Sequence, residues 1–501
     1  MIERPNLYGI SPYNPPQKTI TEKEYREKLI SLGKDKNLTY ADDKFYEDFE
    51  NLRNDLYDMI TYDASELDVT GTKYYVSTSG DDNADGLSPE TAWRSLEKVT
   101  EYPFKEGDGV YFKRGDLWRG STELQNGVTY QAYGQGPKPK IYSSYNGITE
   151  AEWIKTDTEN IWVFNKALDE TDIGVIVFNA GEKYAEKRRT LEEVENNLDF
   201  CFLGEFSNEE GENITNKVYL YCEEGNPAEV FDAIDISQNT SVIKIEKCSH
   251  DITVHNLDVR YGRDYFFTAH LKNINVSYCV FAWQGGNYMR KGWGRAGGGG
   301  GAWLECDGIT MHHCFFTQQF DTAASPQFHG DFDTPCYLNN YSLHDCLIEY
   351  TEYSFEFFNT KKNGDDYGFN NMYLGYNIMR HCGEGFGDKH FASRHIKGWG
   401  HTNNCVNTVF EHNILDRAHV LAIEYTAREP QYTIHNGGAD KISYELLPLL
   451  RNNMFIEPKN KPFANINQII YNFNEIAQIT LGKLGVAKDN IYVFDGDYDK
   501  K

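Results

Sequence analysis

Three acidic residues in the C-terminal half of the chain occupy matching places in a repeated pattern. Glu356, Asp388 and Glu424 are 32 and 36 residues apart, and each follows a short alternating apolar segment by ten or eleven residues. Two carboxyl groups with different pKa values are the equipment of general acid–base chemistry, and glycoside hydrolysis places one on each side of the bond that breaks. These three residues are therefore the candidate catalytic groups.

The segments that precede the acids are copies of one short phrase. Apolar and polar residues alternate within it, which is the pattern of a β-strand, and no helical stretch separates the copies. Self-similarity at a few tens of residues indicates a solenoid, here a parallel β-helix with one coil per phrase. The copies begin at Ile252, Ile274, Ile309, Ser342, Met372 and Thr408, and their last positions are Leu257, Cys279, Cys314, Cys346, Asn377 and Asn413.

Stacked coils convert a sequence position into a column in space, because neighbouring strands lie about 4.8 Å apart. The three acids are then expected on three consecutive coils, where like charges repel and raise at least one pKa. Carboxyl groups about 5–5.5 Å apart suit a retaining glycosidase, and a gap of about 6.5–9.5 Å suits an inverting one. Adjacent coils predict retention, whereas Glu356 paired with Glu424 predicts inversion.

Basic and aromatic residues accompany the acids and could bind a sugar. Arginine, lysine and histidine donate hydrogen bonds to hydroxyl groups, and a tryptophan face can stack on a pyranose. The predicted substrate-binding residues are Arg380, His381, Lys389, His390, Arg394, Trp399 and Tyr425.

A second acidic group is a weak candidate for calcium. Asp321, Asp331 and Asp333 supply the oxygen ligands that Ca²⁺ prefers, although they also suit a simple polar turn. The histidines lack the closed spacing of a zinc site. We therefore expect no cofactor, apart from Ca²⁺ as an open alternative.

The composition limits the partners. The 501 residues carry a formal net charge of −27 at pH 7, which disfavours nucleic acid and anionic membranes. No signal peptide or membrane span is visible in the sequence, and the ten cysteines form no disulfide framework. We expect a cytoplasmic protein with reduced thiols and an oligosaccharide substrate, and the sequence leaves a homo-oligomer open.

The chain divides into three parts. Residues 1–72 show helical periodicity, with Thr21 as a predicted N-cap, and we expect them to cap the open end of the β-helix. Residues 73–430 form the β-helix, which a small β-rich subdomain interrupts at about 150–230. Residues 431–501 form a C-terminal cap segment.

The stretch from Tyr74 to Trp93, which reads YYVSTSGDDNADGLSPETAW, resembles the opening of right-handed parallel β-helix proteins of the pectate-lyase-like superfamily. The inserted segment and the acids on adjacent coils are similar to β-helical β-xylosidase-type glycoside hydrolases. That resemblance implies Asp388 as nucleophile and Glu424 as acid/base, with Glu356 as a supporting carboxylate.

Two other functions stay open at this point. A polysaccharide lyase or uronate epimerase would use Lys389, Arg394 or His390 as the base that removes a proton. A non-catalytic β-helix would bind carbohydrate without turnover.

Overall fold

The computed structural model describes most of the solenoid. The described residues are 15–16, 18–33, 42–166, 168, 172–203, 217–287, 301–328, 336–359, 367–386, 393–400, 405–426, 447–458, 462–466, 469–472 and 492–494.

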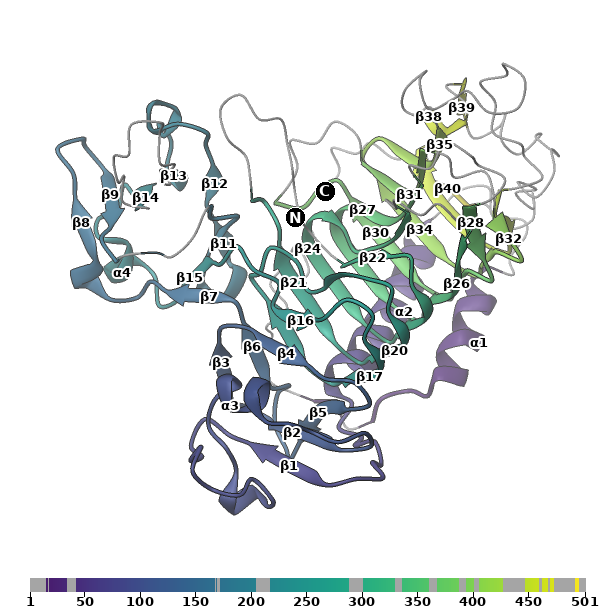
Figure 1. Ribbon diagram of the computed structural model, residues 1–501. Coiled ribbons are helices and arrows are strands. Elements are labelled where there is room, and N and C mark those ends of the chain that lie inside the picture. Colours follow the sequence, from purple (N-terminus) through teal and green to yellow (C-terminus); the bar gives the residue numbers. More distant parts are fainter. Residues whose placement is uncertain are drawn as a thin grey trace.

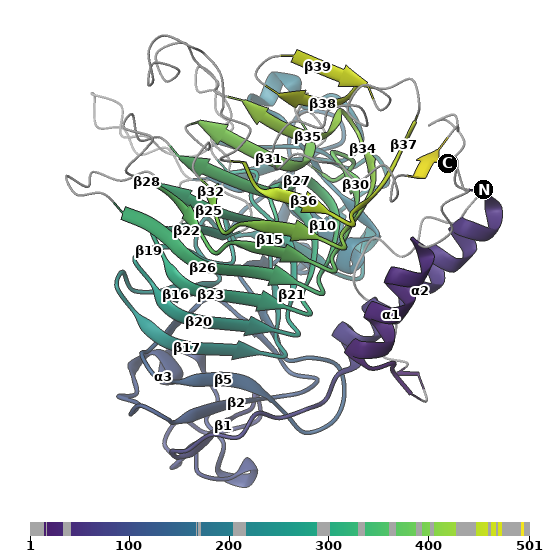
Figure 2. The same cartoon turned by 90° about the vertical axis from the view of Figure 1, so that its right-hand side faces the viewer.

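The core of the molecule is a stack of coils whose strands form long parallel ladders, as the sequence predicts (Figure 2). One ladder, termed the front sheet, runs from the first coil to the last. Its strands are β1 (Lys73–Val76), β2 (Gly109–Lys113), β5 (Thr129–Tyr133), β17 (His250–His255), β20 (Lys272–Ser277), β23 (Asp307–His312), β26 (Cys336–His344), β29 (Tyr373–Gly375), β33 (Val409–Glu411) and β36 (Leu449–Arg451). Two short strands extend it beside β26, namely β28 (Tyr367–Asn370) and β32 (Cys405–Val406).

A second parallel ladder, termed the flank sheet, follows the front sheet in every coil. Its strands are β3 (Leu117–Arg119), β6 (Lys140–Tyr142), β18 (Asp258–Arg260), β21 (Val280–Gln284), β24 (Phe315–Thr322), the first half of β27 (Leu347–Asn359), β30 (Ile378–Cys382), β34 (Ile414–Ala418), β37 (Met454–Pro458) and β40 (Tyr492–Phe494).

A third ladder, termed the site sheet, closes each coil. It comprises β19 (Phe267–Ala269), β22 (Gly301–Leu304), β25 (Ala324–Phe328), the second half of β27, β31 (Arg394–Gly400), β35 (Leu421–Thr426) and β38 (Pro462–Ile466), with β39 (Ile469–Asn472) antiparallel at its end. In the early coils β4 (Thr122–Leu124) pairs with β16 (Ile243–Ile245).

Coils continue beyond the predicted boundary at 430. The strands β36 and β37 pair in parallel with β33 and β34 of the preceding coil. The sequence phrase weakens there, but the backbone ladder needs only strand-compatible residues.

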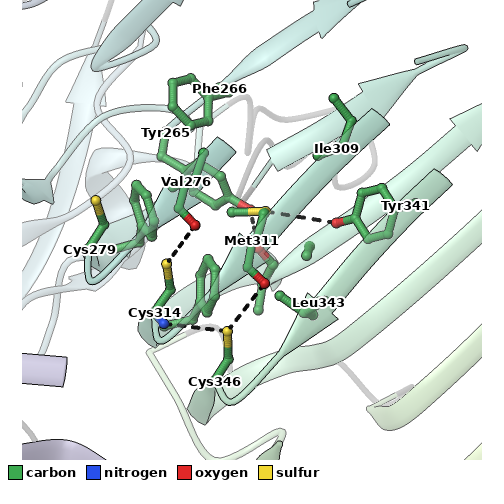
Figure 3. Close-up of a cluster of buried hydrophobic side chains, with 14 of the residues drawn as sticks. Tyr265, Phe266, Val276, Cys279, Ile309, Met311, Cys314, Tyr341, Leu343 and Cys346 are labelled. Atoms are coloured by element: carbon green, nitrogen blue, oxygen red, sulfur yellow. Dashed lines mark hydrogen bonds between the residues drawn. The ribbon is translucent and has the colours of Figure 1, made fainter. Parts of the chain in front are cut away.

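The last positions of the phrases stack inside the coils. Cys279, Cys314 and Cys346 are fully buried, and the Cys314 backbone N–H donates to Cys346 Sγ at 3.4 Å (Figure 3). The next coils carry asparagine at this position, and Asn377 Nδ2 donates to Asn413 Oδ1 at 2.9 Å. These residues form a stacked interior column, and the Asn377 amide satisfies the Cys346 backbone N–H and the Leu343 carbonyl, which would otherwise be buried without partners.

Two N-terminal helices, α1 (Glu22–Leu32) and α2 (Asp43–Tyr62), lie along the side of the stack rather than over its end (Figure 2). Their apolar residues pack on a column of outward side chains of the flank sheet, which corrects the predicted end cap. That column comprises Val280, Phe315, Leu347, Ile378, Ile414 and Met454. The 20 residues of α2 span about 30 Å, which matches about six coils.

The caps of both helices follow the sequence. Thr21 Oγ1 accepts from the Glu24 backbone N–H, and Glu24 accepts from the Thr21 backbone N–H at 2.8 Å, a complete capping box. Asp42 accepts from the Phe45 backbone N–H at the start of α2. The predicted N-cap at Thr21 is therefore confirmed.

Ion pairs fix α2 to the coils beneath it. Arg53 donates through Nε and Nη2 to the two oxygens of Glu349, at 2.8 and 2.6 Å. Arg380 donates to both oxygens of Glu50 at 3.0 and 2.6 Å, and it lies between Glu349 and Asp416.

A β-rich subdomain leaves the stack after the third coil strand and projects to one side (Figure 1). It forms two small sheets around its own apolar core. Its strands are β7 (Ser144–Asn146), β8 (Trp153–Lys155), β9 (Ile161–Phe164), β10 (Ile176–Phe178), β11 (Lys183–Tyr184), β12 (Glu186–Lys187), β13 (Asp199–Leu203), β14 (Lys217–Tyr221) and β15 (Ile234–Ser237). Short helices α3 (Leu96–Glu101) and α4 (Pro227–Val230) complete the fold.

In the part of the chain that the structure describes, every helix is too short or too polar to cross a membrane.

Acid should destabilise this fold through its buried histidines. Burial lowers the pKa of His255, His313 and His395 to about 4, below the value of about 6.5 expected in the unfolded chain. The unfolded chain therefore binds more protons between pH 6.5 and 4. We expect the full free energy of unfolding above pH 6.5 and a loss on the order of 3 kcal/mol per ring as the pH approaches 4.

Denaturant unfolding at several pH values between 4.5 and 7.5 would measure this loss. His395→Gln should make the pH dependence shallower, because glutamine has no ring to be protonated. A free energy of unfolding that is constant across this range would contradict the prediction.

Candidate active site

Two of the three predicted acids lie on one ladder of the site sheet. Glu356 on β27 is opposite Lys397 on β31, and Lys397 is opposite Glu424 on β35. Their strand neighbours Phe355, Ile396 and Ile423 point into the core. Because side chains alternate along a strand, the two glutamates and Lys397 point away from the core, on the outer face of the site sheet.

Lys397, not Asp388, occupies the ladder position between the two glutamates. The prediction counted eleven residues from Asn377, whereas strand β31, which carries the ladder position, begins at Arg394. The ladder position is therefore reached at Lys397. Asp388 lies outside the described residues, so its catalytic role stays a prediction.

Glu356 is held on both sides by donors. Its Oε1 lies 2.7 Å from Lys397 Nζ, and its Oε2 accepts from Ser325 Oγ at 3.3 Å. Gln327 Nε2 in turn donates to Ser325 Oγ at 2.6 Å. Glu356 is only 6% exposed, so these partners supply the polar contacts that solvent cannot.

Glu424 has an equivalent set of donors. Arg394 Nε lies 3.1 Å from Glu424 Oε2, and Asn465 Nδ2 donates to Oε1 at 3.0 Å. Asn465 is the ladder neighbour of Glu424 on β38. The side chain of Glu424 is partly exposed.

Lys397 remains charged in this setting. Burial alone would lower the pKa of its ammonium group, but the Glu356 carboxylate, with Tyr353 and Asp321, raises that pKa above its usual value. The ammonium also lies 3.8 Å from the centre of the Tyr353 ring. A permanent cation thus separates the two carboxylates.

The sequence did not identify Lys397, Ser325 and Asn465. The signal for Lys397 is the alternation of Ile396 and Lys397 in β31, which aligns with Phe355 and Glu356 of the previous coil. The signal for Asn465 is weaker, because it lies beyond the predicted end of the coils.

Three predicted substrate-binding residues lie elsewhere. Arg380 is buried beneath α2 and paired with Glu50. His381 is stacked on Tyr350 with ring centres 4.7 Å apart, and burial lowers its pKa. Tyr425 follows Glu424 by one residue, so the strand alternation turns it into the core, where it is fully buried.

The other predicted binding residues divide as follows. Arg394 belongs to the site, through its contact with Glu424. Lys389 and His390 lie outside the described residues, and so does the side chain of Trp399. The calcium alternative stays a prediction, because Asp331 and Asp333 lie outside the described residues, while Asp321 lies within electrostatic reach of Lys397.

Comparison with known proteins gave structural matches only. No protein-family model matches the sequence. No curated protein matches it.

Among solved structures, the chain is similar to XylC in complex with xylose, with a TM-score of 0.40, 9% identity and coverage of 84% of this chain and 82% of that one. It is also similar to the GH136 lacto-N-biosidase from Eubacterium ramulus, with a TM-score of 0.37, 13% identity and coverage of 84% and 68%. A third match is the family 28 exopolygalacturonase of Yersinia enterocolitica, with a TM-score of 0.33, 9% identity and coverage of 85% and 76%.

Removing the lysine between the two carboxylates should destabilise the protein. Lys397→Met leaves Glu356 almost buried without its cation, and breaking a buried ion pair costs about 3–5 kcal/mol. The double variant Glu356→Gln/Lys397→Met should regain part of this loss, because it removes both charges. Denaturant unfolding measures both effects.

Lys44→Met is the matched control, since Lys44 pairs with Asp48 on an exposed helical turn. We expect it to change the free energy of unfolding by less than about 0.5 kcal/mol. If Lys397→Met were equally harmless, the ion pair on the site sheet would not hold Glu356.

Proposed function

We propose that the protein is a glycoside hydrolase that cleaves an oligosaccharide with Glu356 and Glu424 as its carboxyl pair. The observation that carries the proposal is their position on one outward ladder, two strand steps apart, with Lys397 between them. Both carboxylates accept hydrogen bonds from residues of neighbouring coils, which fix their orientation.

The spacing favours inversion. Two strand steps correspond to about 9.6 Å between backbones, close to the upper end of the range for inverting glycosidases. In such a reaction one carboxyl group protonates the leaving oxygen and the other removes a proton from the attacking water. Retention would need a closer pair, such as the one that the resemblance to β-xylosidase-type enzymes implies for Asp388.

Lys397 and Arg394 are positioned to support this reaction. Each holds one carboxylate by a charge-assisted contact. Their remaining N–H groups can donate to sugar hydroxyls, and the acidic molecule as a whole favours a neutral sugar over a polyanion.

The described cations Lys397 and Arg394 are unsuited to act as the base of a lyase, whereas the other candidate bases, Lys389 and His390, lie outside the described residues. A lyase needs an unprotonated base, whereas the raised pKa of Lys397 keeps it charged. Arg394 is paired with Glu424, and a guanidinium does not lose its proton in proteins.

Substitution of either acid should remove activity without unfolding the protein. Glu356→Gln and Glu424→Gln keep shape and hydrogen-bonding capacity but lose acid–base function, so we expect kcat to fall by about 10²–10⁴-fold or more. The measurement is turnover of the best substrate from a screen of chromogenic glycosides.

Glu411→Gln is the matched control, because Glu411 is also paired with an arginine, Arg451, but lies on the front sheet. Its activity should equal that of the unmodified protein. Normal turnover in both Glu356→Gln and Glu424→Gln would refute the assignment of the pair, and binding of sugars without any turnover would favour a non-catalytic β-helix.

The stereochemistry of the product tests the spacing. We expect NMR to show that the first-formed anomer is inverted relative to the substrate, because two strand steps between the acids exceed the gap that suits a retaining pair. A retained anomer would contradict this pair and would favour Asp388 as one of the two catalytic carboxylates.

A further inference from the structure

The corner between the front sheet and the flank sheet carries a second cluster of chemically active side chains. Each coil turns this corner through one residue with positive φ, including Tyr278, His313, Asp345 and Tyr376 at 51–56°. Helix α1 lies over this corner, since Tyr25 donates to the Tyr376 carbonyl at 2.8 Å. Side chains of the corner and of α1 therefore meet.

His313 is the unusual member of this cluster. It is fully buried, its ring is stacked on Tyr278 at 4.7 Å, and its Nδ1 lies 2.9 Å from His312 Nδ1. Within the described part of the chain its Nε2 has no hydrogen-bond partner. The nearest carboxylate oxygen, Glu22 Oε2, is 3.8 Å away, too far for an N–H donor.

This geometry suits a lone pair on His313 Nε2. With the proton on His313 Nδ1, the ring donates to His312 and turns an unprotonated Nε2 toward the carboxylates. Burial lowers the pKa of His313 to about 4, so the ring is neutral at physiological pH. A neutral imidazole with one free nitrogen is the form that binds metal ions.

Two carboxylates complete a set of three ligands. One atom each from Glu22, His313 and Asp345 lie within 4.8 Å of one another. Asp345 Oδ2 accepts from Arg26 and His344, while Oδ1 accepts only from Arg26 Nε, at 2.9 Å, among the contacts that the structure gives. A carboxylate oxygen can accept twice, so Oδ1 keeps one lone pair.

We propose that Glu22, His313 and Asp345 form a binding site for a divalent transition-metal ion of the Zn²⁺ class. One nitrogen and two carboxylate oxygens suit zinc better than Mg²⁺ or Ca²⁺, which prefer oxygen ligands alone. Ligand atoms around tetrahedral zinc lie about 3.4 Å apart for bonds of about 2.1 Å. The partly exposed Glu22 can close the remaining gap, and solvent supplies the fourth ligand.

Arg26 fits this site as an outer partner. It contacts Glu22 Oε1 at 2.9 Å as well as Asp345, so it orients both carboxylates and offsets one of their charges. The ion would join the first turn of α1 to the coils of β23 and β26. This proposal is independent of the hydrolase proposal, because the cluster lies at the other corner of the coils from the site sheet.

Cobalt provides a direct probe. Protein treated with a chelator and dialysed should bind one equivalent of Co²⁺ and show the strong visible absorption of four-coordinate cobalt. Zn²⁺, but not Mg²⁺, should displace it and raise the melting temperature. Glu22→Gln should weaken Co²⁺ binding at least tenfold, and His313→Gln should abolish it.

Glu27→Gln is the matched control, because Glu27 is an exposed acid on the same helix. It should bind Co²⁺ like the unmodified protein. If His313→Gln fails to fold, the Glu22→Gln variant alone tests the proposed metal site. The proposal is overturned by the absence of the absorption band, or by an unchanged band in Glu22→Gln, which would show an adventitious ion only on the acidic surface.

Discussion

The parallel backbone ladder is the constraint on which the other features depend. Each coil lies on the next in register, so a residue type repeated at one position becomes a continuous column. Columns of apolar residues make the core, and a column of asparagines satisfies buried amides. The same constraint forces charged residues at repeated positions into proximity, where they must be compensated.

The charges are neutralised in the same way at two places on the same three coils. On the site sheet the ladder reads Glu356, Lys397, Glu424, and on the flank sheet it reads Glu349, Arg380, Asp416. Acid, base and acid alternate in both. The flank set is covered by α2 and paired with its Glu50 and Arg53, which suits a structural role. The site-sheet set has no described helix over it, which is why we assign the chemistry there.

The repeated phrase was sufficient to predict the fold, because strand alternation and a constant period are local properties of the sequence. The position of the helices was not predictable in the same way. An apolar stripe on α2 shows that one face is buried but does not show against which surface. The helix could cover the open end of the β-helix or the outward flank-sheet residues Val280, Phe315 and Leu347, and it covers the latter. Glu356 and Glu424 were found because their coils have similar turns. Lys397 was missed because a count of eleven residues from Asn377 ends before strand β31 begins at Arg394. Tyr425 was misassigned because proximity in sequence was given more weight than strand parity.

The N-terminal helices also have a consequence for biosynthesis. Helices α1 and α2 leave the ribosome before the coils do, yet the surface on which they rest extends to Met454. During translation these helices cannot complete their contacts until the coils as far as Met454 have been made. Their docking then links early and late coils in a single step. Coils that otherwise contact only their neighbours are thereby expected to fold and unfold cooperatively.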